Sequence, residues 1–97
     1  MAYGYGLTDV AQISSGGALD SGQIVRVFDV CFGSTSNANH LIRMFNSADS
    51  GTQTINEYIS INSNNPFFNS NAGIRFNKGC FVVAAGCTAT INFIREY

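Results

Sequence analysis

The sequence predicts an all-β fold, a compact, jelly-roll-like β-sandwich of about seven to eight short antiparallel strands. Short runs of β-branched and aromatic residues alternate with polar ones, and clusters of glycine, serine and asparagine separate these runs roughly every 8–12 residues. No segment shows a sustained helical period. Because 97 residues are enough for one domain, we expect residues 1–14 to form an N-terminal arm or short strand and residues 15–97 to form a single β-sandwich domain.

The clearest strand is predicted at residues 24–32, between the turn signals Ser21-Gly22 and Gly33-Ser34. Strict alternation places Phe28 and Val30 on one face and Val27 and Cys31 on the other. Since both faces are largely apolar, we expect this strand to be central or covered on both sides. A shorter strand is predicted at residues 39–46.

Residues 52–61 are predicted to form a strand with Ile55, Ile59 and Ile61 facing the core. A helix is the alternative because Ile55 and Ile59 are four positions apart, but β-branched residues dominate this segment and favour a strand. Residues 62–71 are predicted to be a long polar loop. Phe67 and Phe68 would anchor this loop, either by plugging the core or by contacting a neighbouring subunit.

Three closing strands are predicted at residues 74–76, 80–85 and 88–94, with turns at residues 77–79 and 85–87. Two very short strands, at residues 10–13 and 18–19, are predicted around a turn at residues 14–17. The count of seven to eight strands depends on treating each of these glycine clusters as a chain reversal.

The chain carries unusually little charge. Charged residues make up 11% of the sequence, against the usual share of about 25%, and the formal net charge is -1. The low charge favours self-assembly, with a low-charge monomer as the alternative. Because the five cations are scattered singly, we expect no nucleic-acid partner. We also expect no membrane span and no secretion signal, and therefore folding in a cytoplasm.

No catalytic, metal or cofactor site is predicted, and we expect the protein not to be an enzyme. The six carboxylates form no obvious pair, and there is a single histidine, His40. The three cysteines, Cys31, Cys80 and Cys87, lack metal-binding spacing. We expect free thiols, buried at Cys31 and Cys80 and more exposed at Cys87. A Cys–His dyad with His40 remains an open alternative.

The closing pattern resembles the C-terminal half of many small structural proteins of tailed bacteriophages. The resemblance is carried by Ile74-x-Phe76, Gly79, Phe81-Val82-Val83, Gly86, Thr88-Ala89-Thr90-Ile91 and Tyr97, with Ser15-Gly16-Gly17-Ala18-Leu19 and Val27-Phe28-Asp29-Val30 upstream. It implies a virion structural protein of the capsid decoration or cement type, commonly a homotrimer. Such a subunit would bind the major capsid protein on the capsid surface after assembly in the host cytoplasm.

The expected contacts of this subunit lie near the two ends of the chain and in the aromatic pair. They are Tyr3, Tyr5, Phe67, Phe68, Arg95 and Tyr97. The alternative function is a fibre or knob-type receptor- or glycan-binding module of a phage particle. That module would use an exposed aromatic residue, such as Tyr58 or Phe67, together with asparagine side chains.

Overall fold

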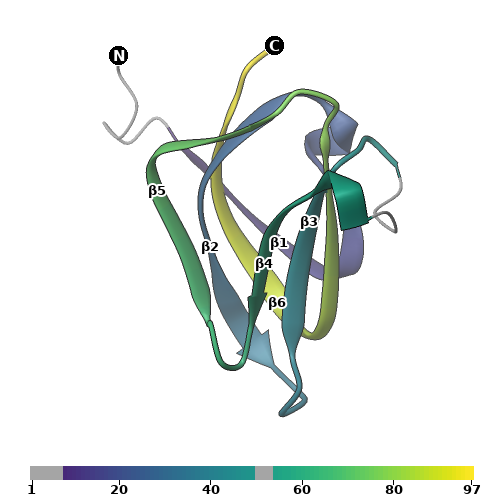
Figure 1. The fold of residues 1–97 in the computed structure, drawn as a ribbon, viewed down its shortest axis with the longest axis vertical. Helices are drawn as coiled ribbons and strands as arrows, with labels where there is room; N and C mark the ends of the chain where they lie inside the picture. The colour runs from purple at the N-terminus through teal and green to yellow at the C-terminus, as the bar shows by residue number, and fades with distance from the viewer. Residues whose placement is uncertain (1–7, 50–53) are drawn as a thin grey trace.

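The computed structural model describes residues 8–49 and 54–97, which form one antiparallel sheet of six strands (Figure 1). The strands are β1 (Asp9–Leu19), β2 (Val25–Thr35), β3 (Leu41–Asn46), β4 (Glu57–Asn62), β5 (Phe67–Phe76) and β6 (Cys80–Arg95). The short 3₁₀ turns η1 (Asp20–Gly22) and η2 (Thr54–Asn56) precede β2 and β4. The predicted all-β class is confirmed, but in the described residues the strands are fewer and longer than predicted.

The sheet is organised around β6, its longest strand. The strand order is β4-β3-β6-β2-β5, and β1 also pairs with β6. Residues 80–83 of β6 lie between β1 and β3, whereas residues 88–93 lie between β1 and β2. The sheet curls until its two end strands, β4 and β5, contact each other (Figure 1). In the described part of the chain these two strands form no hydrogen-bonded ladder, so the sheet is nearly closed.

Two of the predicted turns are bends inside long strands. β6 continues through Gly86, whose φ is +66°, and a Cβ there would lie 2.7 Å from Cβ of Asn37. β1 continues through a register shift between Ser14 and Gly16, with φ of 69° at Ser15. Residues with positive φ can bend a strand as well as reverse a chain, and a bulge adds curvature. The predictions of turns at residues 14–17 and 85–87 are therefore wrong.

A bulge in β2 changes which side chains face the core. The register of β2 with both β5 and β6 shifts between Val27 and Asp29. Val27 and Val30 consequently both lie in the core, whereas Phe28 lies on the outer side of the sheet and Cys31 points outward and is exposed. Strict alternation placed Val27 with Cys31, so that assignment is wrong because the bulge adds one residue to the strand.

The predicted loop at residues 62–71 is mostly strand. β4 extends to Asn62 and β5 begins at Phe67, so residues 63–66 alone form the connection. The side chain of Asn62 shapes this turn: its Oδ1 accepts hydrogen bonds from the backbone N–H groups of Asn64 (2.9 Å) and Asn65 (3.0 Å). Upstream, the strand interpretation is confirmed for β4, but Ile55 lies in η2 and is 85% exposed rather than in the core.

The core is formed by the inward faces of all six strands. Its fully buried side chains include Leu19, Val25, Val27, Val30, Ile42, Met44, Phe45, Ile61, Phe76, Cys80, Val82 and Ile91. Within residues 8–49 and 54–97, one polar side chain, Asn46 at the end of β3, is buried beside them. Asn46 Nδ2 donates to Tyr58 Oη (3.0 Å) and Asn77 Oδ1 (2.8 Å), and its Oδ1 accepts from Lys78 N (2.9 Å). Asn46 thereby joins β3, β4 and the β5–β6 turn.

Candidate functional site

The C-terminal end of β6 carries a hydrogen-bonded cluster that we call the C-terminal clamp: Asp9, Asp20, Arg95 and Tyr97. Arg95 Nε lies 3.1 Å from Asp20 Oδ2, and its Nη1 donates to Asp9 Oδ2. Tyr97 Oη donates to Asp20 Oδ2 at 2.8 Å. The guanidinium also lies over the Phe93 ring, 5.5 Å from its centroid. Arg95 and Tyr97 are thus exposed yet held in defined positions.

The clamp affects the acidity of its tyrosine. The hydrogen bond to the Asp20 carboxylate is the main cause that raises the pKa of Tyr97 above its ordinary value, and desolvation and the charge of Asp20 add to it. The neutral phenol is therefore the form that the clamp favours.

Glu96 fastens the same end of the chain on the opposite side of the strand. Its Oε2 accepts from Arg26 Nε at 2.8 Å and its Oε1 accepts from Arg75 Nε at 3.0 Å. Because side chains alternate along an extended chain, Arg95 and Tyr97 point one way and Glu96 the other. Arg95 and Glu96 are therefore fixed by ion pairs on opposite sides, and Tyr97 is fixed by its hydrogen bond to Asp20.

The predicted contact residues are not all brought together. Phe67 is 63% exposed at the start of β5, whereas Phe68 is half-buried and packs against the core. Phe67 pairs with Cys31 of β2, whereas Arg95 pairs with Val25 of β2. Six residues along a strand span about 20 Å, so Phe67 lies well away from the C-terminal clamp. Tyr3 and Tyr5 lie outside the described residues.

Strands β5, β2, β6 and β1 share an outward surface that we call the polar face. Cross-strand neighbours form three rows on it: Asn69–Asp29–Asn92–Val10, Phe67–Cys31–Thr90–Gln12 and Ser34–Thr88–Ser14. Side-chain hydrogen bonds run along these rows, from Asn92 Nδ2 to Asp29 Oδ1 (2.8 Å), from Gln12 Nε2 to Thr90 Oγ1 (3.4 Å) and between the Ser14 and Thr88 hydroxyls (3.1 Å). The polar face is therefore rich in amides and hydroxyls and carries one carboxylate.

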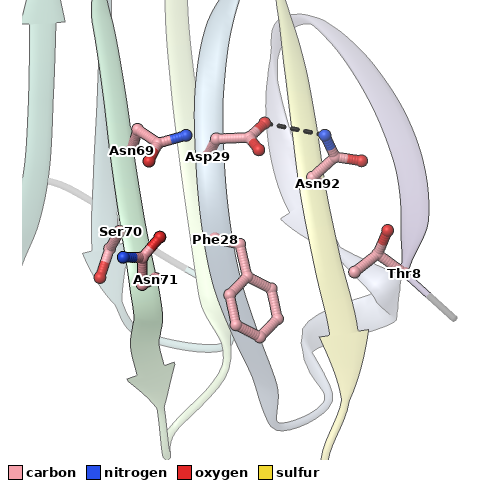
Figure 2. Close-up of a pocket in the computed structure, with 7 residues that line it drawn as sticks. All are labelled: Thr8, Phe28, Asp29, Asn69, Ser70, Asn71 and Asn92. Carbon is pink, nitrogen blue, oxygen red and sulfur yellow. Dashed lines mark hydrogen bonds between the residues drawn. The ribbon is translucent and has the colours of Figure 1, made fainter. Parts of the chain in front are cut away.

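A hollow in this face, which we call the polar groove, lies where β5 departs from β2. Val27 pairs with Ile74 and Asp29 pairs with Asn69, so four residues of β5 lie opposite Phe28 alone. The groove has a volume of about 380 Å³ and is lined by Thr8, Phe28, Asp29, Asn69, Ser70, Asn71 and Asn92 (Figure 2).

The excursion of β5 beside the groove has a defined geometry. Ser70 Oγ accepts a hydrogen bond from Gly73 N at 3.1 Å, and Gly73 has φ of +76°. A Cβ at Gly73 would lie 2.7 Å from Arg26 Cγ and 2.9 Å from Phe28 Cε1. A glycine is therefore required here both by its φ and by the close approach of β2.

His40 and Cys87, candidates for a Cys–His dyad, make other contacts. His40 packs edge-on against Phe32, with ring centroids 4.4 Å apart, and its Nδ1 lies 2.8 Å from the Asn37 carbonyl oxygen. Cys87 Sγ donates to the Leu41 carbonyl oxygen at 3.3 Å. In the described ranges no hydrogen bond joins His40 to a cysteine.

The three cysteines have different environments. All are free; Cys80 is buried, Cys87 is intermediate and Cys31 is exposed. Burial raises the pKa of the Cys80 thiol and, less strongly, that of Cys87. The expected burial is thus confirmed for Cys80 and wrong for Cys31, which the β2 bulge turns outward.

Comparison with known proteins adds no assignment: no family model matches the chain, and neither a curated protein nor a solved structure matches it. The described residues include no cluster of three or more histidine, cysteine or acidic side chains arranged to hold a metal ion. They also include no helix long and apolar enough to cross a membrane. The site must therefore be interpreted from its own geometry.

Proposed function

We propose that the protein is a virion structural protein, a capsid decoration or cement subunit that binds and stabilises the shell of major capsid proteins and performs no catalysis. The C-terminal clamp is the observation that supports this proposal most. It presents an exposed arginine and an exposed tyrosine, two residue types that are enriched where protein interfaces gain most of their binding energy.

The clamp also reduces the cost of forming an interface. Immobilising a long side chain on binding costs about 0.5–1.5 kcal/mol. Arg95 and Tyr97 are already held by Asp9 and Asp20 before any partner arrives. A partner surface can therefore use both side chains with little further loss of entropy.

The proposed subunit is a jelly-roll-like sandwich that assembles into a homotrimer. The bends at Gly86 in β6 and at Ser15 in β1 support a jelly-roll-like sandwich in which β3 and β4 form one layer and β2 and β5 the other. The low charge of the sequence supports assembly into a homotrimer on the capsid surface. The resemblance to phage structural proteins supplies the major capsid protein as the partner.

The alternative is a fibre or knob-type receptor- or glycan-binding module, which the polar groove supports. Tyr58 and Phe67, the aromatic residues that the sequence suggests for such a module, do not form one site. The Tyr58 ring packs against Phe76 at 5.3 Å between centroids, whereas Phe67 is at the other end of β5. Phe67 lies opposite Cys31 and Phe76 opposite Val25, and these six residue steps of β2 correspond to about 20 Å.

The test is co-sedimentation of the purified protein with empty heads and, separately, with tails. The proposal expects binding to heads and none to tails. Tyr97→Ala should weaken head binding about 10-fold or more, as removal of a central interface aromatic does. Ile55→Ala is the matched control, because Ile55 is 85% exposed and lies outside the clamp. Binding to tails instead of heads would favour the fibre alternative, and binding to neither would overturn both.

A further inference from the structure

We propose that the polar groove binds a neutral polyhydroxylated ligand, most simply one sugar ring of a glycan. This inference does not rest on the capsid function, because it concerns a different surface from the C-terminal clamp. The groove's hydrogen-bonding groups, its floor and its charge all favour such a ligand.

The groove presents donors and acceptors close together. Figure 2 shows Asn69 and Asn92 reaching toward Asp29 from the two flanking strands, with the Phe28 ring below. A carboxylate accepts hydrogen bonds, an amide both donates and accepts, and hydroxyl groups do the same. Neighbouring sugar hydroxyls need this mixture, because each hydroxyl is both a donor and an acceptor.

Much of this hydrogen-bonding capacity is unused within the described protein. Asp29 makes one side-chain hydrogen bond there, at 2.8 Å from its Oδ1 to Asn92 Nδ2, which leaves Oδ2 available. The amides of Asn69 and Asn71 make no hydrogen bond to any group in residues 8–49 and 54–97, and both side chains are exposed. A ligand can therefore gain hydrogen bonds without breaking existing ones.

The shape of the groove fits a small ligand with one apolar side. Its volume of about 380 Å³ is within the usual range of roughly 300–1,000 Å³ for ligand sites. Phe28, which is 9% exposed, closes the groove below the amides and gives its floor a small apolar area.

The charge of the groove disfavours other ligand classes. Among the described residues that line it, Asp29 is the one ionisable group, and its charge opposes phosphates, nucleic acids and acidic sugars. Arg26, on the neighbouring part of β2, is directed to Glu96 at 2.8 Å and to the Ala72 carbonyl oxygen at 3.2 Å. A lone carboxylate with amide oxygens is also a poor Ca²⁺ site compared with the several carboxylates usual for that ion.

The experiment is a two-dimensional amide NMR titration of the full chain with methyl glycosides of glucose, galactose, mannose and N-acetylglucosamine, and separately with Ca²⁺ alone. We expect saturable shifts with at least one glycoside, centred on the backbone amides of Asp29, Asn69, Asn71 and Asn92. Asn69→Ala and Asn71→Ala should each weaken binding about 3- to 10-fold, as expected for loss of one hydrogen bond. Asn64→Ala is the matched control, with an exposed amide outside the groove, and should change the affinity less than twofold.

Three results would overturn the proposal: no saturable shift with any glycoside, shifts centred outside the groove, or binding of Ca²⁺ in the groove without binding of a glycoside. The unliganded spectra of the variants show whether each has folded. The wild-type shift map tests the site even where a variant fails to fold. A negative result here would leave the proposed binding to heads unaffected, because that depends on the C-terminal clamp.

Discussion

Replacing the buried Asn46 tests how β3, β4 and the β5–β6 turn are held together. Asn46 is 5% exposed, and its amide makes three hydrogen bonds, to Tyr58, Asn77 and the backbone N–H of Lys78. Asn46→Ala removes all three. At about 0.5–1.5 kcal/mol for each bond the loss would be roughly 1.5–4.5 kcal/mol. Because the side chains of Tyr58 and Asn77 are exposed and can reach water, we expect a loss of about 2–3 kcal/mol.

The expected loss is large enough to measure in a domain of this size. An unfolding entropy of about 2.1 cal/mol/K per residue means that 1 kcal/mol lowers Tm by roughly 5 °C for 97 residues. Asn46→Ala should therefore lower Tm by about 10–15 °C. The free energy of unfolding would be measured by urea denaturation followed by circular dichroism, with the slope m unchanged.

Two variants serve as controls for this measurement. Tyr58→Phe removes one of the three bonds and should cost about 1 kcal/mol or less. Asn64→Ala removes an exposed amide from the turn after β4 and should stay within about 0.5 kcal/mol of the wild type. If Asn46→Ala were no more destabilising than Asn64→Ala, the role assigned to the buried amide would be refuted.

Three further predictions test the bend in β6, the C-terminal clamp and the cysteines. Gly86→Ala should destabilise the fold by at least about 2 kcal/mol in thermal unfolding, because alanine is strained at a φ of +66° and its Cβ has no room; unchanged stability would contradict the bend. Asp20 raises the pKa of Tyr97 in the folded protein. The stabilisation of the fold by this hydrogen bond should therefore be present below about pH 10 and be lost as the pH rises through the raised pKa of Tyr97. The difference between the absorbance titration curves of the wild type and of Tyr97→Phe isolates the titration of Tyr97. Its midpoint should lie above pH 10 and should fall in the Asp20→Asn variant. A midpoint at or below pH 10 would refute the hydrogen bond between Tyr97 and Asp20. Cys31 should react with a thiol reagent in the native state while Cys80 reacts only on unfolding, and equal rates would contradict their assigned burial.

The fold class could be predicted because alternation and turn residues are local signals. The strand at Leu41–Asn46 and the long apolar run in β6 follow directly from them. The predictions that were wrong, namely the two turns and the burial of Cys31, concern features that depend on how the strands pair. A glycine such as Gly86 is compatible with both a turn and a bend, and pairing with β1 on both sides of it decides the outcome. Likewise, nothing local identifies the bulge that turns Cys31 to the outer face of the sheet.

The candidate site could be predicted in part. Arg95 and Tyr97 were predicted as contacts from their place in the sequence, but Asp20, which holds them, is 77 positions from Tyr97. The polar groove does not follow from the sequence as long as residues 62–71 are predicted to be a loop. The signal was present in the spacing of Asn69 and Asn71, which places both side chains on one face once the segment is recognised as a strand.

Imaging of whole particles tests the central proposal most directly. Electron cryomicroscopy of the virion should show density matching this β-fold on the outer surface of the capsid, repeated over the shell in groups of three. The C-terminal clamp should face either the major capsid protein or a neighbouring copy. Light scattering of the purified protein, whose chain mass is 10.4 kDa, would show separately whether the trimer forms before capsid binding. Density for this fold on the tail or fibres, with none on the shell, would contradict the account.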